Sequence, residues 1–289
     1  MADRHLFVTD LDGTLFTDDK TVSERDLETL RRLRRRGNVV AAATGRSLYS
    51  FERALATMGA DTGSLPLDYL IFSTGAGVLW FAENRIVRHL AISRSEVVQI
   101  TSCFEQMRLD YMIHKPIPDT HHFMFRSHGR DNPDFFQRIG LYEAFASPLT
   151  PNAPVFESAT QVLAVIPPKV SLKQVAQIQK KLSEFSVVHA TSPLDHQSAW
   201  IEVFHPRASK GIAAAWLAEQ LNIPPARVVA VGNDFNDQDL LAWAGQSFRV
   251  ANAVPELKTG TRLPESNNKN GVTRAAERAG LLEQINSDL

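Results

Sequence analysis

Residues 5–14 read His-Leu-Phe-Val-Thr-Asp-Leu-Asp-Gly-Thr, and this stretch decides the fold of the chain. Residues 5–9 form a short apolar run that is typical of a buried strand, and the run stops at Asp10. Two carboxylates that lie two positions apart at a strand end repel each other unless a cation sits between them. Oxygen ligands suit magnesium, and a carboxylate can also attack phosphorus. The stretch indicates phosphoryl chemistry at Asp10 and Asp12, or alternatively an Asp-Gly turn with no catalytic role.

The same pattern, an apolar run that stops at polar residues, recurs along the chain. Residues 38–43 stop at Thr44, residues 69–72 stop at Ser73-Thr74, and residues 227–231 stop before Asn233-Asp234. Helical stretches lie between these runs, the first of them after the expected N-cap Ser23. Apolar strands that alternate with helices predict a doubly wound parallel sheet that is covered on both faces.

The polar residues at these strand ends are expected to meet, although they lie far apart in the sequence. Ligands of open α/β sheets bind outside the carboxyl ends of the strands. The sheet assignment therefore brings Asp10, Thr44, Ser73-Thr74 and Asn233-Asp234 to one edge and predicts a site there.

The middle of the chain has a different pattern. A hairpin is expected within residues 78–90, and short strands and helices then alternate up to about residue 190. This region predicts a separate α+β unit that is inserted into the sheet domain. The predicted organisation is a sheet core over residues 1–88 and 192–289, with the inserted unit over residues 89–191.

The composition excludes several classes of protein. The 289 residues are 44% hydrophobic and 22% charged, with a net charge of −1, which argues against a disordered tail and against nucleic-acid binding. The single cysteine, Cys103, rules out an intrachain disulfide. No signal peptide and no apolar run of about 20 residues is visible, so we expect a cytoplasmic protein without a membrane segment. The oligomeric state has no signature in the sequence.

Four motifs together resemble those of the haloacid dehalogenase-like hydrolase superfamily. Asp10-Leu11-Asp12-Gly13-Thr14 is similar to the first motif, and Thr44-Gly45-Arg46 is similar to the second in the Cof-type branch. Lys210 resembles the third motif, and Gly232-Asn233-Asp234-Phe235-Asn236-Asp237 resembles the fourth, which usually reads Gly-Asp-x-x-Asn-Asp. They occur in the right order on the right predicted elements. The insert between the second and third motifs resembles the Cof-type (C2) cap arrangement.

The resemblance implies a magnesium-dependent phosphatase that acts on small phosphorylated metabolites, with sugar phosphates as the first expectation. Asp10 would be the nucleophile, Asp12 the general acid and base, and Lys210 the group that neutralises the phosphoryl charge. The implied phosphate-binding residues are Leu11, Thr44, Gly45, Lys210 and Asn236. The implied metal-binding residues are Asp10, Asp12, Asn233 and Asp237.

One position departs from the family pattern. The usual metal-binding aspartate falls at Asn233, whose amide oxygen can still bind magnesium but carries no charge. The neighbouring Asp234 is the alternative third ligand, so the metal assignment stays open between the two. Two other functions also stay open: a sugar phosphomutase with the same two aspartates, and a regulatory protein that only binds a phosphometabolite.

Overall fold

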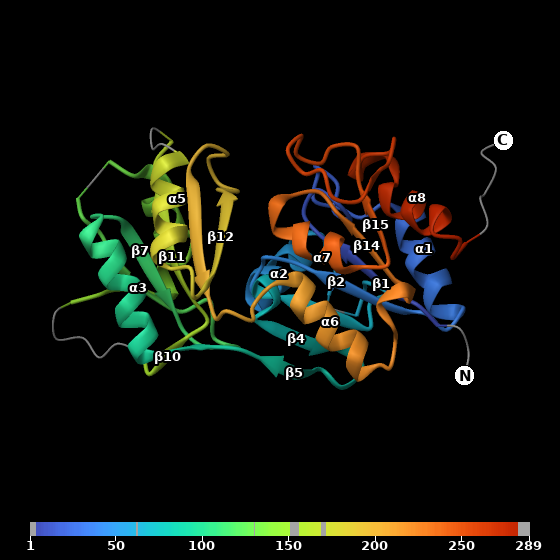
Figure 1. Cartoon of the computed structure of the whole chain (residues 1–289), viewed down its shortest axis with the longest axis horizontal. Coiled ribbons are helices and arrows are strands. Elements are labelled where there is room, and N and C mark those ends of the chain that lie inside the picture. The colour runs from blue at the N-terminus through green and yellow to red at the C-terminus, as the bar shows by residue number, and fades with distance from the viewer. Residues whose placement is uncertain (1–3, 62, 130, 151–155, 169–171, 283–289) are drawn as a thin grey trace. The chain divides into compact units, whose positions relative to one another are not determined.

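The computed structural model describes residues 4–61, 63–129, 131–150, 156–168 and 172–282. The chain forms two compact units, which are coloured along the sequence in Figure 1. The core unit contains Met1–Arg46, Phe51–Arg88 and Ser209–Leu289, and the inserted unit contains Ser47–Ser50 and His89–Ala208. Within the described ranges, no helix is both long enough and apolar enough to cross a membrane.

The core unit is built on an eight-stranded sheet with the order β16-β15-β14-β1-β2-β3-β4-β5. The strands from β16 to β3 run parallel, and β4 then pairs antiparallel with β3. β1 lies between β14 and β2, so Asp10 at its end is close to the ends of both neighbours. The strand bounds are β1 Leu6–Asp10, β2 Val39–Ala43, β3 Tyr69–Phe72, β4 Gly77–Trp80, β5 Arg85–His89, β14 Val228–Gly232, β15 Gln246–Arg249 and β16 Thr261–Arg262.

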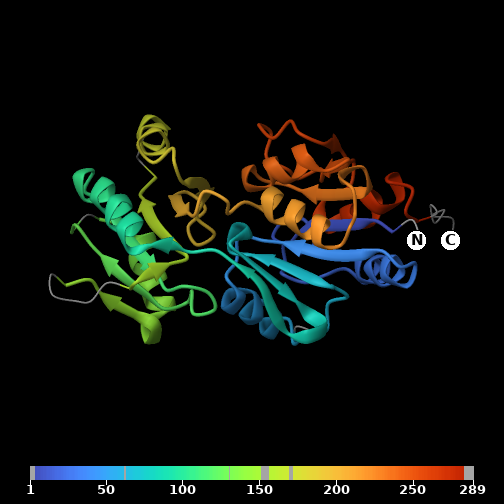
Figure 2. The same cartoon turned by 60° about the horizontal axis from the view of Figure 1, so that its bottom comes forward.

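Helices cover both faces of this sheet. Figure 2 shows the orange helices on one side of the core strands and the blue helices on the other. Ser23 caps the first helix as expected, because its hydroxyl accepts a hydrogen bond from the Asp26 amide at 3.0 Å. The predicted doubly wound parallel sheet is thereby confirmed. The helices of this unit are α1 Glu24–Arg35, α6 Lys210–Gln220, α7 Gln238–Trp243, α8 Gly271–Arg278 and most of α2 Leu48–Thr57, whose first residues are grouped with the inserted unit.

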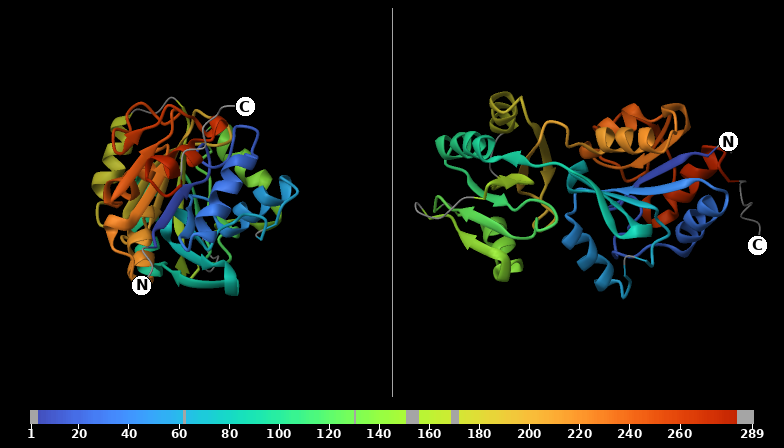
Figure 3. Two further views of the ribbon diagram at one scale, coloured as in Figure 1. Left: turned by 90° about the vertical axis from the view of Figure 1, so that its right-hand side faces the viewer. Right: turned by 90° about the horizontal axis from the view of Figure 1, so that it is seen from below.

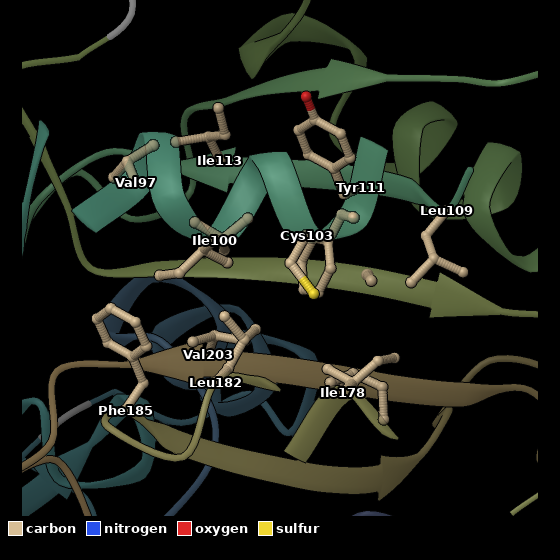
Figure 4. Packing of buried hydrophobic residues seen from close by; sticks show 14 of the residues in the cluster. Val97, Ile100, Cys103, Leu109, Tyr111, Ile113, Ile178, Leu182, Phe185 and Val203 are labelled. Atoms are coloured by element: carbon tan, nitrogen blue, oxygen red, sulfur yellow. The ribbon is translucent and has the colours of Figure 1, made fainter. Parts of the chain in front are cut away.

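The inserted unit is an α+β unit with a six-stranded sheet of order β12-β13-β11-β7-β8-β9. Figure 3 (right) shows two helices, α3 (Arg94–Gln106) and α5 (Leu172–Lys181), on one side of this sheet and α4 (Pro133–Leu141) on the other. Side chains of α3 and α5 pack with the strands in one apolar cluster, part of which is drawn in Figure 4. The strands are β7 Asp110–His114, β8 Phe123–Arg126, β9 Ala146–Pro148, β11 Gln161–Ile166, β12 Ser186–Thr191 and β13 Ala199–Phe204, and a two-stranded pair joins β6 Ile92–Ser93 to β10 Ser158–Ala159.

The structure differs from the sequence prediction at the second border between the units. The prediction assigned residues 192–208 to the core, whereas the structure groups them with the inserted unit. The reason is β13, which was not predicted and which pairs along its whole length with both β11 and β12. A strand with hydrogen-bonded neighbours on both edges cannot be separated from its sheet, so the unit extends to Ala208.

Candidate active site

A buried lysine connects three of the sequence motifs. Asp10 ends β1 with only 5% of its surface exposed, and its Oδ1 accepts a hydrogen bond from Nζ of Lys210 at 2.7 Å. The same Nζ donates to Oδ1 of Asp237 at 2.5 Å and to Oδ1 of Asn236 at 3.1 Å. A cation in the first turn of a helix opposes the helix dipole. Lys210 is the first residue of α6 and is fully buried. It can be buried there because these three oxygens compensate its charge.

Burial and neighbouring charges set the protonation of this group. Burial, together with the charge of Asp237, raises the pKa of Asp10 to about 7 against the lowering effect of Lys210. Burial works to lower the pKa of Lys210, but the Asp10 and Asp237 carboxylates outweigh it and raise that pKa above its ordinary value. Two carboxylates share one ammonium, so the ionised site has an excess of negative charge that favours a further cation.

Asp12 is held by an arginine of the second motif. Nε of Arg46 lies 2.6 Å from Oδ2 of Asp12, and Nη2 lies 2.7 Å from Oδ1, which makes the pair bidentate. Burial works to raise the pKa of Asp12, but Arg46 and the nearby Lys20 outweigh burial and lower it. The sequence prediction gave Arg46 no role. The only signal for it was its place in Thr44-Gly45-Arg46.

Polar groups from the ends of β2 and β3 lie around Gly45 together with Asn236. A Cβ placed on Gly45 would lie 3.6 Å from Nδ2 of Asn236 and 3.7 Å from Oγ1 of Thr74. That hydroxyl is buried and has no hydrogen-bond partner among the described residues, and the Thr74 amide donates to the Thr44 carbonyl at 3.0 Å. The Thr74 hydroxyl, the side-chain amide of Asn236 and the backbone of Gly45, which has no side chain to cover it, thus lie around one point. This arrangement suits an anion.

The backbone around Thr74 is strained, and a glycine makes its position possible. Ser73 and Thr74 have φ angles of 47° and 53°, which are unfavourable for residues with side chains and most of all for a β-branched one. At Gly75, a Cβ would lie 2.1 Å from the carbonyl oxygen of Ser209. Only glycine therefore lets this turn approach the start of α6, and strain of this kind is often retained at functional sites.

The side chain of Asn233 meets the oxygens that the resemblance assigns to a metal. With its amide oriented to satisfy its neighbours, Nδ2 donates to Oδ2 of Asp10 at 3.1 Å and to the carbonyl of Asp12 at 3.2 Å. In the opposite orientation Oδ1 would face the same two oxygens, and a cation would then have to lie among them. One carboxylate, one carbonyl and one amide oxygen are ligands that fit Mg²⁺. Within the described ranges no three His, Cys, Asp or Glu side chains form a metal site.

The two remaining aspartates of the fourth motif have other partners. Oδ1 of Asp234 accepts from the amide of Phe235 at 2.7 Å and caps the short helix that begins there. Oδ2 of Asp237 accepts from the amides of Asn233 and Asp234 at 2.8 and 3.1 Å, so this carboxylate holds the loop while its other oxygen binds Lys210. The side chain of Asn233, and not that of Asp234, therefore lies beside Oδ2 of Asp10, while Asp237 supports the loop and Lys210.

Leu11, the remaining predicted phosphate-binding residue, sets the turn that follows Asp10. Its carbonyl accepts hydrogen bonds from the amides of Thr14 and Phe16 at 3.1 and 2.8 Å. Its side chain is buried, so only its backbone is available to a ligand.

Comparisons with known proteins match this chain in sequence and in fold. The model of the haloacid dehalogenase-like hydrolase family matches residues 7–275. The chain is 27% identical to the 5-amino-6-(5-phospho-D-ribitylamino)uracil phosphatase YitU of Bacillus subtilis, over 93% of this chain and 95% of the relative. It is 26% identical to an HMP-PP phosphatase of Escherichia coli, over 86% and 85%. A solved phosphatase of the HAD superfamily from Bacteroides thetaiotaomicron has the same fold, with a TM-score of 0.75, 17% identity and 96% coverage of both chains.

Proposed function

The chain belongs to the haloacid dehalogenase-like hydrolases and is a phosphoric monoester hydrolase, and from this premise we propose a magnesium-dependent phosphatase that works through a phosphoryl-aspartate on Asp10. The observation that carries the proposal is the bridge from the fully buried Lys210 to Asp10, Asn236 and Asp237 at the carboxyl edge of the sheet. The polar groups around Gly45 support it, because the Thr74 hydroxyl and the Asn236 amide are donors for a phosphoryl group.

The two oxygens of Asp10 have different neighbours, which separates their roles. Oδ1, on the Lys210 side, attacks phosphorus, and the bond from phosphorus to the leaving oxygen breaks. Lys210 offsets the charge that develops there. Mg²⁺ would be held by Oδ2 of Asp10, the Asp12 carbonyl and Asn233, and when bound it would neutralise further negative charge.

Asp12 handles the protons in both steps. In the first step the protonated carboxyl of Asp12 gives its proton to the leaving oxygen. For this step, Asp12 must leave its ion pair with Arg46 and take up a proton. In the second step its carboxylate takes a proton from water, the water oxygen attacks phosphorus, and the bond to Asp10 breaks. Phosphate leaves and Asp10 is regenerated.

Small phosphorylated metabolites are the proposed substrates, with sugar and polyol phosphates first. The relatives support this class, because YitU is named for a substrate with a phosphorylated ribityl chain and another relative for HMP-PP. The proposal is tested by measuring phosphate release from a panel of such esters. We expect activity with magnesium, its loss with excess chelator, and its return when magnesium is added. Full activity of dialysed protein in chelator would contradict the metal requirement, and isomerised sugar phosphate without free phosphate would indicate a mutase.

The Asn233→Asp variant is expected to need less magnesium. An aspartate at this position would add a carboxylate beside Oδ2 of Asp10 and the Asp12 carbonyl, both of which now face an amide at 3.1 and 3.2 Å. A hard cation binds more tightly to more charged oxygen ligands. We expect the half-saturating magnesium concentration to fall by about tenfold, with turnover kept or raised. Titration of magnesium against phosphate release measures this directly.

Asp234→Asn is the matched control for that titration. Its carboxylate caps the Phe235 amide, and an amide oxygen can accept the same hydrogen bond. The magnesium requirement of this variant should therefore stay close to that of the wild type. A sharp rise with Asp234→Asn, together with no effect of Asn233→Asp, would move the third ligand from Asn233 to Asp234.

A further inference from the structure

The turn that carries Asp12 is held by the C-terminal part of the core unit. This turn follows β1 and covers residues 11–18. The carbonyl oxygens of Gly13 and Phe16 in the turn accept hydrogen bonds at 2.8 and 3.1 Å. Both donors are asparagine side chains, which lie 239 and 251 positions further along the chain. The turn is therefore fixed by a distant segment of the same unit.

Asn252, the first of these asparagines, uses both ends of its side-chain amide. Its Nδ2 donates to the carbonyl oxygen of Gly13, and its Oδ1 accepts from the backbone amide of Asn267 at 3.0 Å. Asn252 lies in the loop after β15, where the amide of Val254 donates to the carbonyl of Asn233 at 2.9 Å. One loop thus contacts both the turn after β1 and the fourth motif.

Asn267, the second asparagine, binds the far end of the same turn. Its side chain is 1% exposed, and its Nδ2 donates to the carbonyl of Phe16 and, at 2.9 Å, to Oδ1 of Asp18. The neighbouring Asn268 donates from Nδ2 to Oδ2 of Asp18 at 2.7 Å and accepts from the Asp18 amide at 3.0 Å. Hydrogen bonds from Asn267 and Asn268 lower the pKa of Asp18, so this carboxylate stays ionised and keeps both bonds.

The ordinary role of asparagine in loops does not account for these bonds. Asparagine in a turn usually bonds to backbone groups within a few residues of itself. The side chains of Asn252, Asn267 and Asn268 instead reach a segment that lies 239 to 251 positions away. A buried amide such as that of Asn267 is costly unless its hydrogen bonds are made, and here they are made to the turn of Asp12.

The position of this turn matters most when the Asp12 carboxyl acts on a substrate. In the structure Arg46 binds both oxygens of that carboxylate, at 2.6 and 2.7 Å. Asp12 has to leave this ion pair for the proposed proton transfer, and the place of its carboxyl then depends on the backbone that carries it. A displacement of about 1 Å can cost about a hundredfold in rate.

We propose that Asn252 and Asn267 are positioning residues, which fix the turn after β1 so that the Asp12 carboxyl meets the leaving oxygen of the substrate. They act through their hydrogen bonds to the carbonyls of Gly13 and Phe16. An amide does not ionise, so these bonds persist while Asp12 gains and loses its proton. The proposal rests on the proposed function, since it takes Asp12 as the group that protonates the leaving oxygen.

The test compares two phosphate esters in the Asn252→Ala variant, which removes both hydrogen bonds of this side chain. The ribityl oxygen of D-ribitol 5-phosphate is a strongly basic leaving group that needs a proton, whereas p-nitrophenolate leaves readily without one. We expect kcat/KM to fall about thirtyfold for ribitol phosphate and at most about threefold for p-nitrophenyl phosphate. Gln246→Ala removes an exposed amide side chain from β15 and should change neither value.

The Asp12→Asn background shows whether Asn252 acts through Asp12. Asp12→Asn should by itself lower kcat/KM for ribitol phosphate far more than for p-nitrophenyl phosphate. In that background Asn252→Ala should lower the value for ribitol phosphate no further, because the group that it positions is already gone. A further loss as large as in the wild-type background would overturn the proposal.

Hydrogen exchange and thermal unfolding separate positioning from a general loss of structure. The amides of Thr14 and Phe16 donate to the Leu11 carbonyl within the turn, so they should exchange faster in Asn252→Ala than in the wild type. Asn252 is exposed, so the unfolding midpoint should fall by no more than about 3 °C. Unchanged exchange in the turn, or equal losses of kcat/KM for the two esters, would overturn the proposal.

Failure of the proposed function would be distinguishable from failure of this inference. If the wild type hydrolysed neither ester, the phosphatase proposal would fail, and the positioning of a general acid would fail with it. If the wild type hydrolysed both esters and Asn252→Ala kept their ratio, the positioning role alone would be overturned. If Asp12→Asn lowered both values equally, Asp12 would not be the general acid, although the nucleophile Asp10 would be unaffected.

Discussion

The Asp10→Asn variant should lose phosphate release by at least about a thousandfold in kcat while it stays folded. Asp10 is the carboxylate that we propose as the nucleophile, and an amide in its place is a far weaker nucleophile. The amide oxygen can still accept the hydrogen bond that Lys210 now makes at 2.7 Å, so the packing at the end of β1 should survive. Steady-state phosphate release, together with thermal unfolding, measures both parts of this expectation.

A matched control and a clear contrary outcome are available for this variant. Asp61→Asn makes the same chemical change at an exposed position of the core unit and should leave kcat as it is. If purified Asp10→Asn kept more than a few per cent of the wild-type activity, the phosphoryl-aspartate mechanism would be wrong. The family assignment would be unaffected, because it rests on a match over residues 7–275.

Lys210→Met should both inactivate and destabilise the protein. The ammonium is fully buried between two carboxylates, at 2.7 Å from Asp10 and 2.5 Å from Asp237. Loss of one partner from a buried ionic group usually costs about 3–5 kcal/mol in the free energy of unfolding. Without Lys210 nothing offsets the burial that raises the pKa of Asp10. The variant should therefore lose stability as pH rises and its carboxylates ionise, and denaturant unfolding at pH 5 and pH 8 measures the difference.

A second substitution separates the structural part of the Lys210 effect from the catalytic part. In the double variant Lys210→Met and Asp237→Asn, one of the two unpaired buried charges is gone. Much of the lost stability should return, because the two residues are in direct contact and their effects are not additive. Turnover should stay low, since no cation then offsets the phosphoryl charge. Recovery of activity along with stability would show that Lys210 only supports the fold.

The strands of the core sheet could be predicted from the sequence because their pattern is local. The residues of β1, β2 and β14 are all buried, as expected of strands with helices on both faces. β13 escaped prediction, because Glu202 interrupts its apolar pattern and its neighbours in the sheet lie elsewhere in the sequence. Pairing with β11 decides that strand, and a single sequence contains no direct signal for such pairing.

The sheet topology predicted that the site residues converge, but it did not predict the hydrogen-bond and ion-pair partners of their side chains. Parallel strands end at one edge, so Asp10, Thr44 and Thr74 could be placed together before any distance was known. The clamp of Arg46 on Asp12 and the bond from Lys210 to Asp237 depend on the directions of long side chains that leave different loops. Sequence spacing does not determine those directions.

The sequence by itself determined the place of Asp10 at the end of a buried strand, the order of the four motifs, the doubly wound core and the presence of an inserted unit, because each depends on residues close together in the chain. The tertiary structure decided the partners. It set Asn233 rather than Asp234 against Oδ2 of Asp10 and made Asp237 a support for Lys210. The physical reason is that hydrogen bonds and charge pairing act over a few ångströms in space, and the packing of distant segments alone fixes which groups come that close.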